Sequence, residues 1–363
     1  MDLLCYKIFV DKTKSKKREK ERTLIEKAKS TPSAFKSSYL FIIFIIFTVL
    51  LFSFTTYKRN GIWKDDLQLW ADVVKKAPYN ARGHNNLGVT YQAQDRLEEA
   101  IEEYTVALKL NPDYAPTHYN FGRVYSNQDK VDEAIKEYIT AVRLRPDYTE
   151  GYIVLGNLYN NQGRVEEAIR EYRRALRLNP DQPSARYSLG LAYYKQDELD
   201  EAIEEYKIAV RLKSDYAEAY NSLGLAYSKK GQIDKAIKEY LTALKINPGS
   251  AETHTNIGNA YAKQGRFDEA IIEYRNALRL TYDDAVTHYN MGLTYYNIGR
   301  LDEAIEAYRT AVRLKPDYIA AHYNLGFVYK MKGLKDEARR ELEMVLRLQP
   351  DNPKAMQALE SLR

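Results

Sequence analysis

The sequence predicts an all-α solenoid of eight helix pairs that follows a single N-terminal transmembrane helix. The first observation is a sequence period of 34, since a fixed period in this range is typical of stacked helix pairs. All five histidines of the chain share one phase of it, because their numbers differ successively by 34, 136, 34 and 34, and 136 is four periods. They are His84, His118, His254, His288 and His322. The second observation is a glycine at one phase of every repeat, and the third is a long uncharged run near the N-terminus.

The uncharged run lies between Lys36 and Lys58 and reads SSYLFIIFIIFTVLLFSFTTY. As a helix it would be about 31 Å long, close to the hydrocarbon thickness of a bilayer. We therefore expect residues 37–57 to cross a membrane; a cleaved signal peptide is the alternative. Residues 1–36 form a basic tail, so the positive-inside rule puts the N-terminus in the cytoplasm and the repeats outside it, in a single-pass topology.

The charge distribution argues against nucleic-acid binding, and the cysteine content excludes an intramolecular disulfide. The formal charge is +5 and residues 1–36 contribute +6, which leaves −1 for residues 37–363. A chain without a concentrated basic surface is not expected to bind nucleic acid. Cys5 is the sole cysteine, so no intramolecular disulfide is possible.

Eight ungapped repeats begin at Ala81 and fill residues 81–352. The predicted repeats are 81–114, 115–148, 149–182, 183–216, 217–250, 251–284, 285–318 and 319–352. A degenerate half repeat is expected at 58–80, because Trp70 and Pro78 fall in the same register, and a polar capping helix is expected at 353–363. Positions below are counted from the first residue of each repeat.

Small and large residues recur at helical spacing in each repeat. Position 8 is always glycine, position 20 is always alanine, and position 24 is tyrosine in seven repeats, from Tyr104 to Tyr308. A glycine inside a helix costs about 1 kcal/mol relative to alanine, so eight of them at one phase indicate close contact with a neighbouring helix. We expect the tyrosines to form the core. The turn within each repeat carries glycine or aspartate, residues that tolerate positive φ.

The pattern N-L-G-x-x-Y followed by A-I-x-x-Y-x-x-A-L-x-L-x-P resembles the tetratricopeptide repeat family over residues 81–352. The resemblance implies a right-handed α-solenoid and, since the family consists mainly of binding scaffolds, a binding function. The segment YKRNGIWKDDLQLW is similar to the junction before the repeats in the transmembrane and tetratricopeptide-repeat O-mannosyltransferases. Their catalytic part is a multi-pass membrane domain, which a single span does not match.

The histidines are expected to pack helices together and not to hold a metal. Equivalent helices of adjacent repeats lie about 8–10 Å apart, too far for two imidazoles to reach one ion at about 2 Å. Histidines that are copies of one structural position also offer no catalytic arrangement. We therefore predict no enzyme activity and no metal, and no cofactor is expected.

The candidate binding site is the concave surface lined by the first helices. Asparagines recur two residues after the histidine position, and an amide both donates and accepts, so a row of them can pair with the backbone of an extended peptide. This row resembles the asparagine ladder of O-GlcNAc transferase; the alternative is that each amide only holds neighbouring helices in register. The candidates on this face are Asn86, Asn120, Asn157, Tyr194, Asn256, Asn259, Asn290, Tyr296, Asn324 and Lys330.

Together these features predict a membrane-anchored, non-catalytic scaffold that binds a protein or peptide in its concave groove. The alternative is an accessory subunit of a protein glycosyltransferase system, of the O-mannosyl or O-GlcNAc type, that presents acceptor protein to a membrane-enzyme partner.

Overall fold

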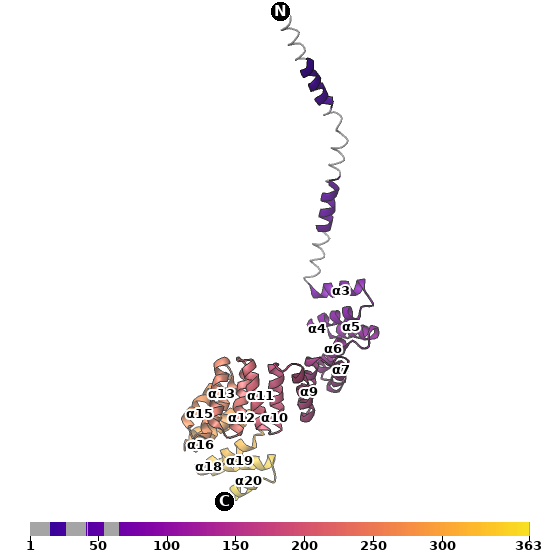
Figure 1. Ribbon diagram of the computed structural model, residues 1–363. Coiled ribbons are helices and arrows are strands. Elements are labelled where there is room, and N and C mark those ends of the chain that lie inside the picture. The colour runs from indigo at the N-terminus through magenta and orange to yellow at the C-terminus, as the bar shows by residue number, and fades with distance from the viewer. Residues whose placement is uncertain (1–14, 27–40, 42, 54–64, 363) are drawn as a thin grey trace, which may run out of the picture. The chain divides into compact units, whose positions relative to one another are not determined.

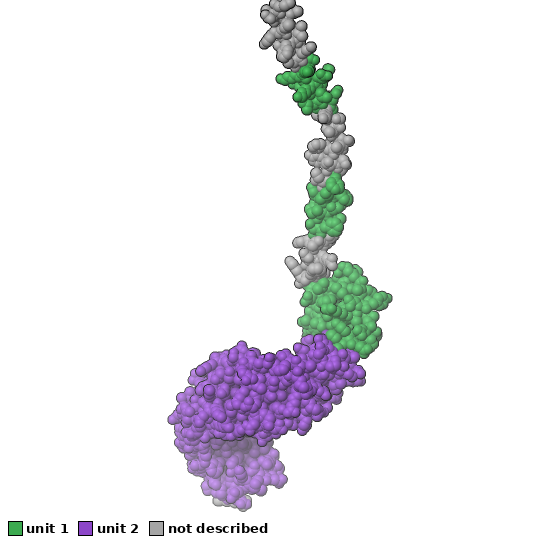
Figure 2. All heavy atoms as spheres, in the orientation of Figure 1, with its two compact units in different colours: residues 1–117 green, residues 118–363 purple. Residues whose placement is uncertain are grey.

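The computed structural model describes residues 15–26, 41, 43–53 and 65–362. Within these ranges the secondary structure is helical, with short turns and no strand, and the paired helices stack as an all-α solenoid within the compact units given next (Figure 1). The chain divides into two compact units, residues 1–117 and 118–363, coloured green and purple in Figure 2. α3, α4, α5 and the start of α6 belong to the first unit, and the rest of α6 with all later helices belongs to the second.

Shorter and longer helices alternate along the chain. The first helices of the pairs are α4 (Ala81–Ala93), α6 (Ala115–Asn127), α8 (Thr149–Asn161), α10 (Pro183–Lys195), α12 (Ala217–Lys229), α14 (Ala251–Lys263), α16 (Ala285–Asn297) and α18 (Ile319–Met331). The second helices are α5 (Leu97–Leu110), α7 (Val131–Leu144), α9 (Val165–Leu178), α11 (Leu199–Leu212), α13 (Ile233–Ile246), α15 (Phe267–Leu280), α17 (Leu301–Leu314) and α19 (Lys335–Leu348). α3 (Asp66–Lys76) packs on α4, and α20 (Pro353–Glu360) packs on α19.

Local sequence explains where the helices begin and end. Side chains of Asn80, Ser250, Asp284 and Asn352 accept hydrogen bonds from the first backbone N–H groups of the helices that follow them. The turn residues predicted to tolerate positive φ do adopt it, from 57° at Asp129 to 79° at Gly231. That conformation reverses the chain within a short turn, so the two helices of a pair lie antiparallel.

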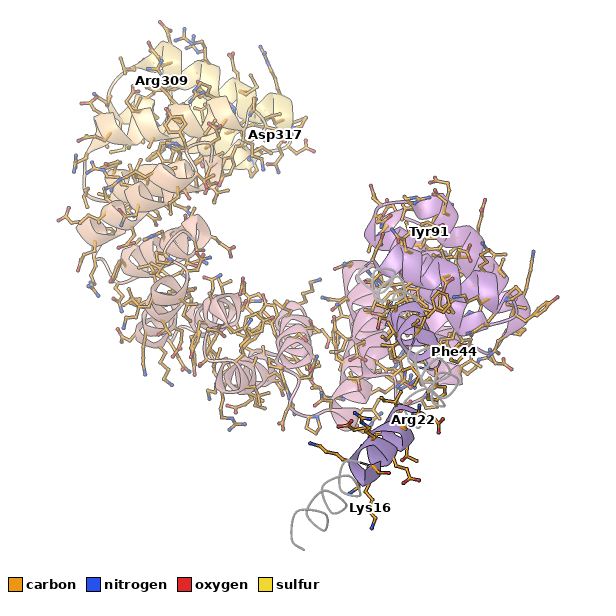
Figure 3. All side chains as sticks on the ribbon, turned by 90° about the horizontal axis from the view of Figure 1, so that it is seen from above. Lys16, Arg22, Phe44, Tyr91, Arg309 and Asp317 are labelled. Carbon is orange, nitrogen blue, oxygen red and sulfur yellow. The ribbon has the colours of Figure 1, made fainter. Side chains whose placement is uncertain are left out.

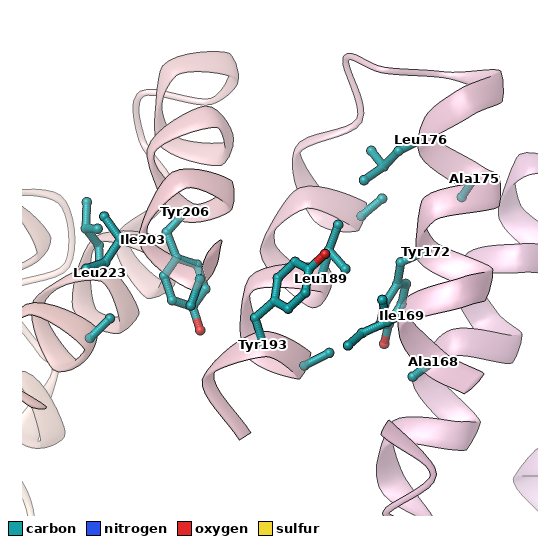
Figure 4. Close-up of a cluster of buried hydrophobic side chains, with 14 of the residues drawn as sticks. Ala168, Ile169, Tyr172, Ala175, Leu176, Leu189, Tyr193, Ile203, Tyr206 and Leu223 are labelled. Carbon is teal, nitrogen blue, oxygen red and sulfur yellow. The ribbon is translucent and has the colours of Figure 1, made fainter. Parts of the chain in front are cut away.

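The predicted close contact of the position-8 glycines with a neighbouring helix is confirmed, and in seven repeats the contacting residue is a tyrosine. A Cβ atom added to Gly224 would lie 2.5 Å from Cε1 of Tyr240, and a similarly close approach recurs from Gly88 to Gly292. The tyrosines at position 24 are at most 1% exposed. Figure 4 shows two of them, Tyr172 and Tyr206, among buried alanine, leucine and isoleucine side chains. Glycine therefore makes room for a ring that fills the space between paired helices.

First helices of successive repeats also touch one another within the second unit. α8 contacts α10, and the series continues through α12, α14 and α16 to α18. In Figure 3 the stacked helices of the second unit follow a curve, from pink to yellow. Because neighbours are closest on the inner side of a curved stack, the first helices line its concave face.

The prediction of a transmembrane helix at 37–57, and with it the single-pass topology with an extracytoplasmic array, is wrong. No helix among the described residues is both long and apolar enough to cross a bilayer. Residues 37–40, 42 and 54–57 of the predicted span lie outside the described residues.

Candidate peptide-binding groove

Four of the ten candidate residues meet in one cavity of the second unit. The cavity has a volume of about 520 Å³ and lies between the first helices α10, α12, α14 and α16. The candidates in its wall are Tyr194, Asn256, Asn259 and Asn290. Other residues of the wall are Leu225, Ser228, Lys229, Tyr240, Ala262, Lys263, Tyr274, Leu293, Thr294 and Asn297. Helix packing thus brings together amides that are one full repeat apart in sequence.

Two asparagines at position 6 form hydrogen bonds between repeats. Asn256 donates from Nδ2 to Oδ1 of Asn221 at 3.1 Å, and Asn324 donates to the hydroxyl of Tyr289 at 3.1 Å. Both bonds join equivalent helices of adjacent repeats, so these amides hold the helices in register. These two residues therefore have a structural role. A ligand that bonded to either amide would share that amide with the internal hydrogen bond.

The asparagines at position 9 bond to a second helix instead. Asn259 accepts a hydrogen bond from the hydroxyl of Tyr274 at 2.9 Å, and Asn157 accepts one from Tyr172 at 2.7 Å. Burial raises the pKa of Tyr274 to about 12, so its hydroxyl remains a donor at neutral pH. Each of these amides therefore has its oxygen fixed on the tyrosine and keeps its two N–H donors for other partners.

The other candidates lie outside this cavity. Asn86, in the first unit, accepts a hydrogen bond from Asn85 at 3.1 Å, and Asn120 is buried. Tyr296 packs edge-on against Phe327 with 6.1 Å between ring centroids. Lys330 donates to the hydroxyl of Ser361 at 2.5 Å. The ten residues predicted from sequence are therefore one cluster of four and six separate positions.

The site residues predicted from sequence do not include a row of lysines at position 13. It consists of Lys195, Lys229 and Lys263, and the last two line the cavity. Their shared phase, one period apart, was visible in the sequence. The predicted residues stand at positions 6, 9 and 12, whereas position 13 of α12, α14 and α16 also faces the cavity.

The histidines form pairs within a repeat. In four repeats the imidazole Nδ1 lies 2.6 Å from a glutamate Oε2 of the second helix: His84–Glu103, His118–Glu137, His254–Glu273 and His322–Glu341. Arg186 takes the same place beside Glu205, at 2.9 Å. Each pair joins the first helix to the second, as expected for packing residues, although the glutamate partners were not anticipated.

Repeating helix pairs of this size, with glycine against tyrosine and a groove along the first helices, define a tetratricopeptide-repeat solenoid. Family profiles described as "TPR repeat" match residues 93–129 and 122–163. A profile described as "Cilia and flagella-associated protein 70 C-terminal domain" matches residues 148–362, more than half of the chain. The chain therefore belongs to the tetratricopeptide repeat family, and within it to the family of that domain.

Two relatives from mammals match a short part of this chain. The human protein named "Protein O-mannosyl-transferase TMTC1" is 39% identical over 69 residues, which are 19% of this chain and 8% of that protein. The mouse protein of the same name is 40% identical over 65 residues, 18% of this chain and 7% of its own length. The matched part of this chain thus spans less than a tenth of these relatives.

Two solved structures share the fold. The APC/C hetero-tetramer Cut9–Hcn1 aligns with a TM-score of 0.55 at 19% identity, over 80% of this chain and 58% of that one. Pseudomonas aeruginosa PilF aligns with a TM-score of 0.53 at 20% identity, over 59% of this chain and 97% of that one. At these identities the likeness supports the solenoid fold alone.

Proposed function

We propose that this protein is a non-catalytic scaffold whose groove holds an extended segment of a partner protein. The supporting observation is the cavity between α10, α12, α14 and α16, which gathers amide side chains from successive repeats. We take 81–352 as the eight repeats that present the groove, with 353–363 as their cap.

The wall of the cavity matches the chemistry of a peptide backbone. An extended chain offers a carbonyl acceptor and an N–H donor at every residue, and a side-chain amide can pair with either. Asn290 and Asn297 make no side-chain hydrogen bond to any described residue, and Asn259 keeps its N–H donors. These three amides are thus available to a ligand at no loss of internal bonds. Leu225 and Leu293 add apolar surface to the same wall.

The proposal that the scaffold is non-catalytic is supported by the use of its histidines. His254 and His322 are bound to glutamates on the adjoining second helix, and neither belongs to the wall of the cavity. An imidazole held in that way is not placed to act on a ligand in the groove.

A second function is favoured by the similarity to TMTC1 over 69 residues. In it the repeats belong to a protein glycosyltransferase system and present acceptor protein to a separate enzyme. Both functions need a peptide in the groove, and they differ in whether a sugar is transferred. Recovery of glycosyltransferase activity with the purified full chain and its captured partner would favour the second function over the first.

Site-specific photocrosslinking tests the groove directly. A photoreactive amino acid is placed at Leu293, which lines the cavity and is exposed, or at Leu241, which is exposed on the second helix α13. We expect the full chain, in extract from its own cells, to form defined adducts from Leu293 that disappear in Asn290→Ala/Asn297→Ala. Adducts of equal yield from Leu241, or adducts that survive the asparagine changes, would contradict the proposal.

A further inference from the structure

Three lysines at position 13 repeat one arrangement in successive repeats of the second unit. Lys195 ends α10, Lys229 ends α12 and Lys263 ends α14, and all three are exposed. Each reaches toward the first helix of the preceding repeat. Nζ of Lys195 donates to the carbonyl of Asn160 at 3.0 Å, and Nζ of Lys263 donates to the hydroxyl of Ser228 at 3.2 Å. Nζ of Lys229 lies 4.9 Å from the centre of the Tyr194 ring.

The charge of this row is only partly neutralised. Lys229 forms an ion pair with Asp197 at 2.6 Å, and both side chains are well exposed to solvent. Lys195 and Lys263 form no ion pair with any described residue. The turn residues explain why only Lys229 has an ion pair. Asp197 is the turn residue one repeat before Lys229, whereas the corresponding turn residues before Lys195 and Lys263 are Gly163 and Gly231. Two ammonium groups of the row thus lack a carboxylate partner in the described part of the chain.

Building on the proposed function, we propose that this lysine row binds an acidic, extended segment of the partner protein, with a carboxylate at about every third residue. Lys229 and Lys263 line the same cavity as Asn259, Asn290 and Asn297. The amides pair with the backbone of the segment, which carries no sequence information. The lysines pair with its side chains and select acidic residues.

The spacing follows from the geometry of stacked helices. Equivalent helices of adjacent repeats are about 10 Å apart. In the polyproline II conformation an extended chain advances about 3.1 Å per residue with three residues per turn, so every third side chain lies on the same side, about one repeat further along. Consecutive lysines of the row therefore meet every third side chain of the ligand, and three lysines accommodate a segment of about seven residues.

A protein ligand fits the row better than a nucleic acid. A phosphate backbone requires a concentrated basic surface, and residues 37–363 carry a net charge of −1, which is the total of +5 less the +6 of residues 1–36.

Fluorescence anisotropy with the full chain and defined probes tests this inference. The probes are a labelled peptide of repeating Asp-Gly-Ser, the same peptide with Asn for each Asp, a peptide with equally many Asp at every second residue, and a single-stranded oligonucleotide. We expect the first peptide to bind at least about fivefold more tightly than the other two peptides. We also expect its affinity to fall as NaCl is raised, because salt screens the exposed charges.

Two triple variants separate the row from total charge. Lys195→Gln/Lys229→Gln/Lys263→Gln should weaken binding of the Asp-Gly-Ser peptide about tenfold, the combined effect of three exposed ion pairs. The control is Lys136→Gln/Arg170→Gln/Lys238→Gln, which removes the same charge from exposed sites at position 22 of second helices. It should change the affinity less than about twofold.

Equal binding of the Asp and Asn peptides, or equal losses in the two triple variants, would overturn the inference. Preferential binding of the oligonucleotide would also overturn it and assign the row to phosphates. If the acidic peptide fails to bind while the crosslinks from Leu293 still depend on Asn290 and Asn297, the groove retains its proposed function and only the acidic specificity is lost.

Discussion

His322 lies between two hydrogen-bond acceptors, one at each ring nitrogen. Its Nδ1 is 2.6 Å from Oε2 of Glu341, and its Nε2 is 3.0 Å from the carbonyl oxygen of Pro316. The ring can donate to both only as the imidazolium ion. The hydrogen bond to Glu341 accordingly raises the pKa of His322, against the opposing effect of burial. The contact between α18 and α19 in this repeat thus depends on the imidazolium charge of His322, which is lost as pH rises.

His322→Arg should make the last repeats less sensitive to pH. The raised pKa of His322 means that its contribution to stability is complete below the ordinary value of about 6.5 and is lost as pH rises through the folded value. Arginine does not titrate, and Arg186 already makes the same bond to Glu205. In the parent chain we expect hydrogen exchange in α18 and α19 to become faster between pH 6 and 8, by about tenfold or less after correction for the intrinsic pH dependence of exchange. In the variant this increase should be smaller. An unchanged pH profile would rule out this role.

Ala307→Glu should raise the pKa of His288. This histidine occupies the position of His322 one repeat earlier, but position 23 is Ala307 in place of glutamate, and its Nδ1 has no partner among the described residues. Burial therefore lowers the pKa of His288, so that its protonation destabilises the fold as pH falls below about 6.5. A carboxylate at 307 should bring the pKa above that value. NMR titration of the ring proton measures it, with His254 as the internal control.

Gly224→Ala should lower the free energy of unfolding by about 1–3 kcal/mol. The added methyl would lie 2.5 Å from Cε1 of Tyr240, whose ring is 1% exposed and cannot move aside. The better helix propensity of alanine offsets about 1 kcal/mol of the clash. Urea unfolding followed by circular dichroism measures the change.

Gly249→Ala is the matched control for this substitution. Its added methyl meets only Oδ1 of Asn247 at 3.6 Å, an ordinary contact. The free energy of unfolding should therefore stay within about 0.5 kcal/mol of the parent value. Equal losses in the two variants would show that the ring of Tyr240 does not make glycine necessary.

The repeat was predictable from sequence because each of its parts has a local cause. Gly224 and Tyr240 stand at positions 8 and 24 of one repeat, and the antiparallel turn between their helices brings every such pair into contact. The same holds for the turn at Gly231, whose positive φ of 79° requires glycine or a small polar residue. Hydropathy alone predicted the membrane helix, and no helix among the described residues is both long and apolar enough to cross a bilayer.

The sequence by itself determined the period, the helix pairs and the residues that face one side of each first helix. Only the tertiary structure decided which of those residues act together. Asn259 and Asn290 reach one cavity with Lys263, while Asn324 and Lys330 lie outside it and bond to Tyr289 and Ser361. The physical reason is that a periodic sequence specifies the same place in every repeat, whereas a hydrogen bond depends on what the next repeat happens to carry at that place.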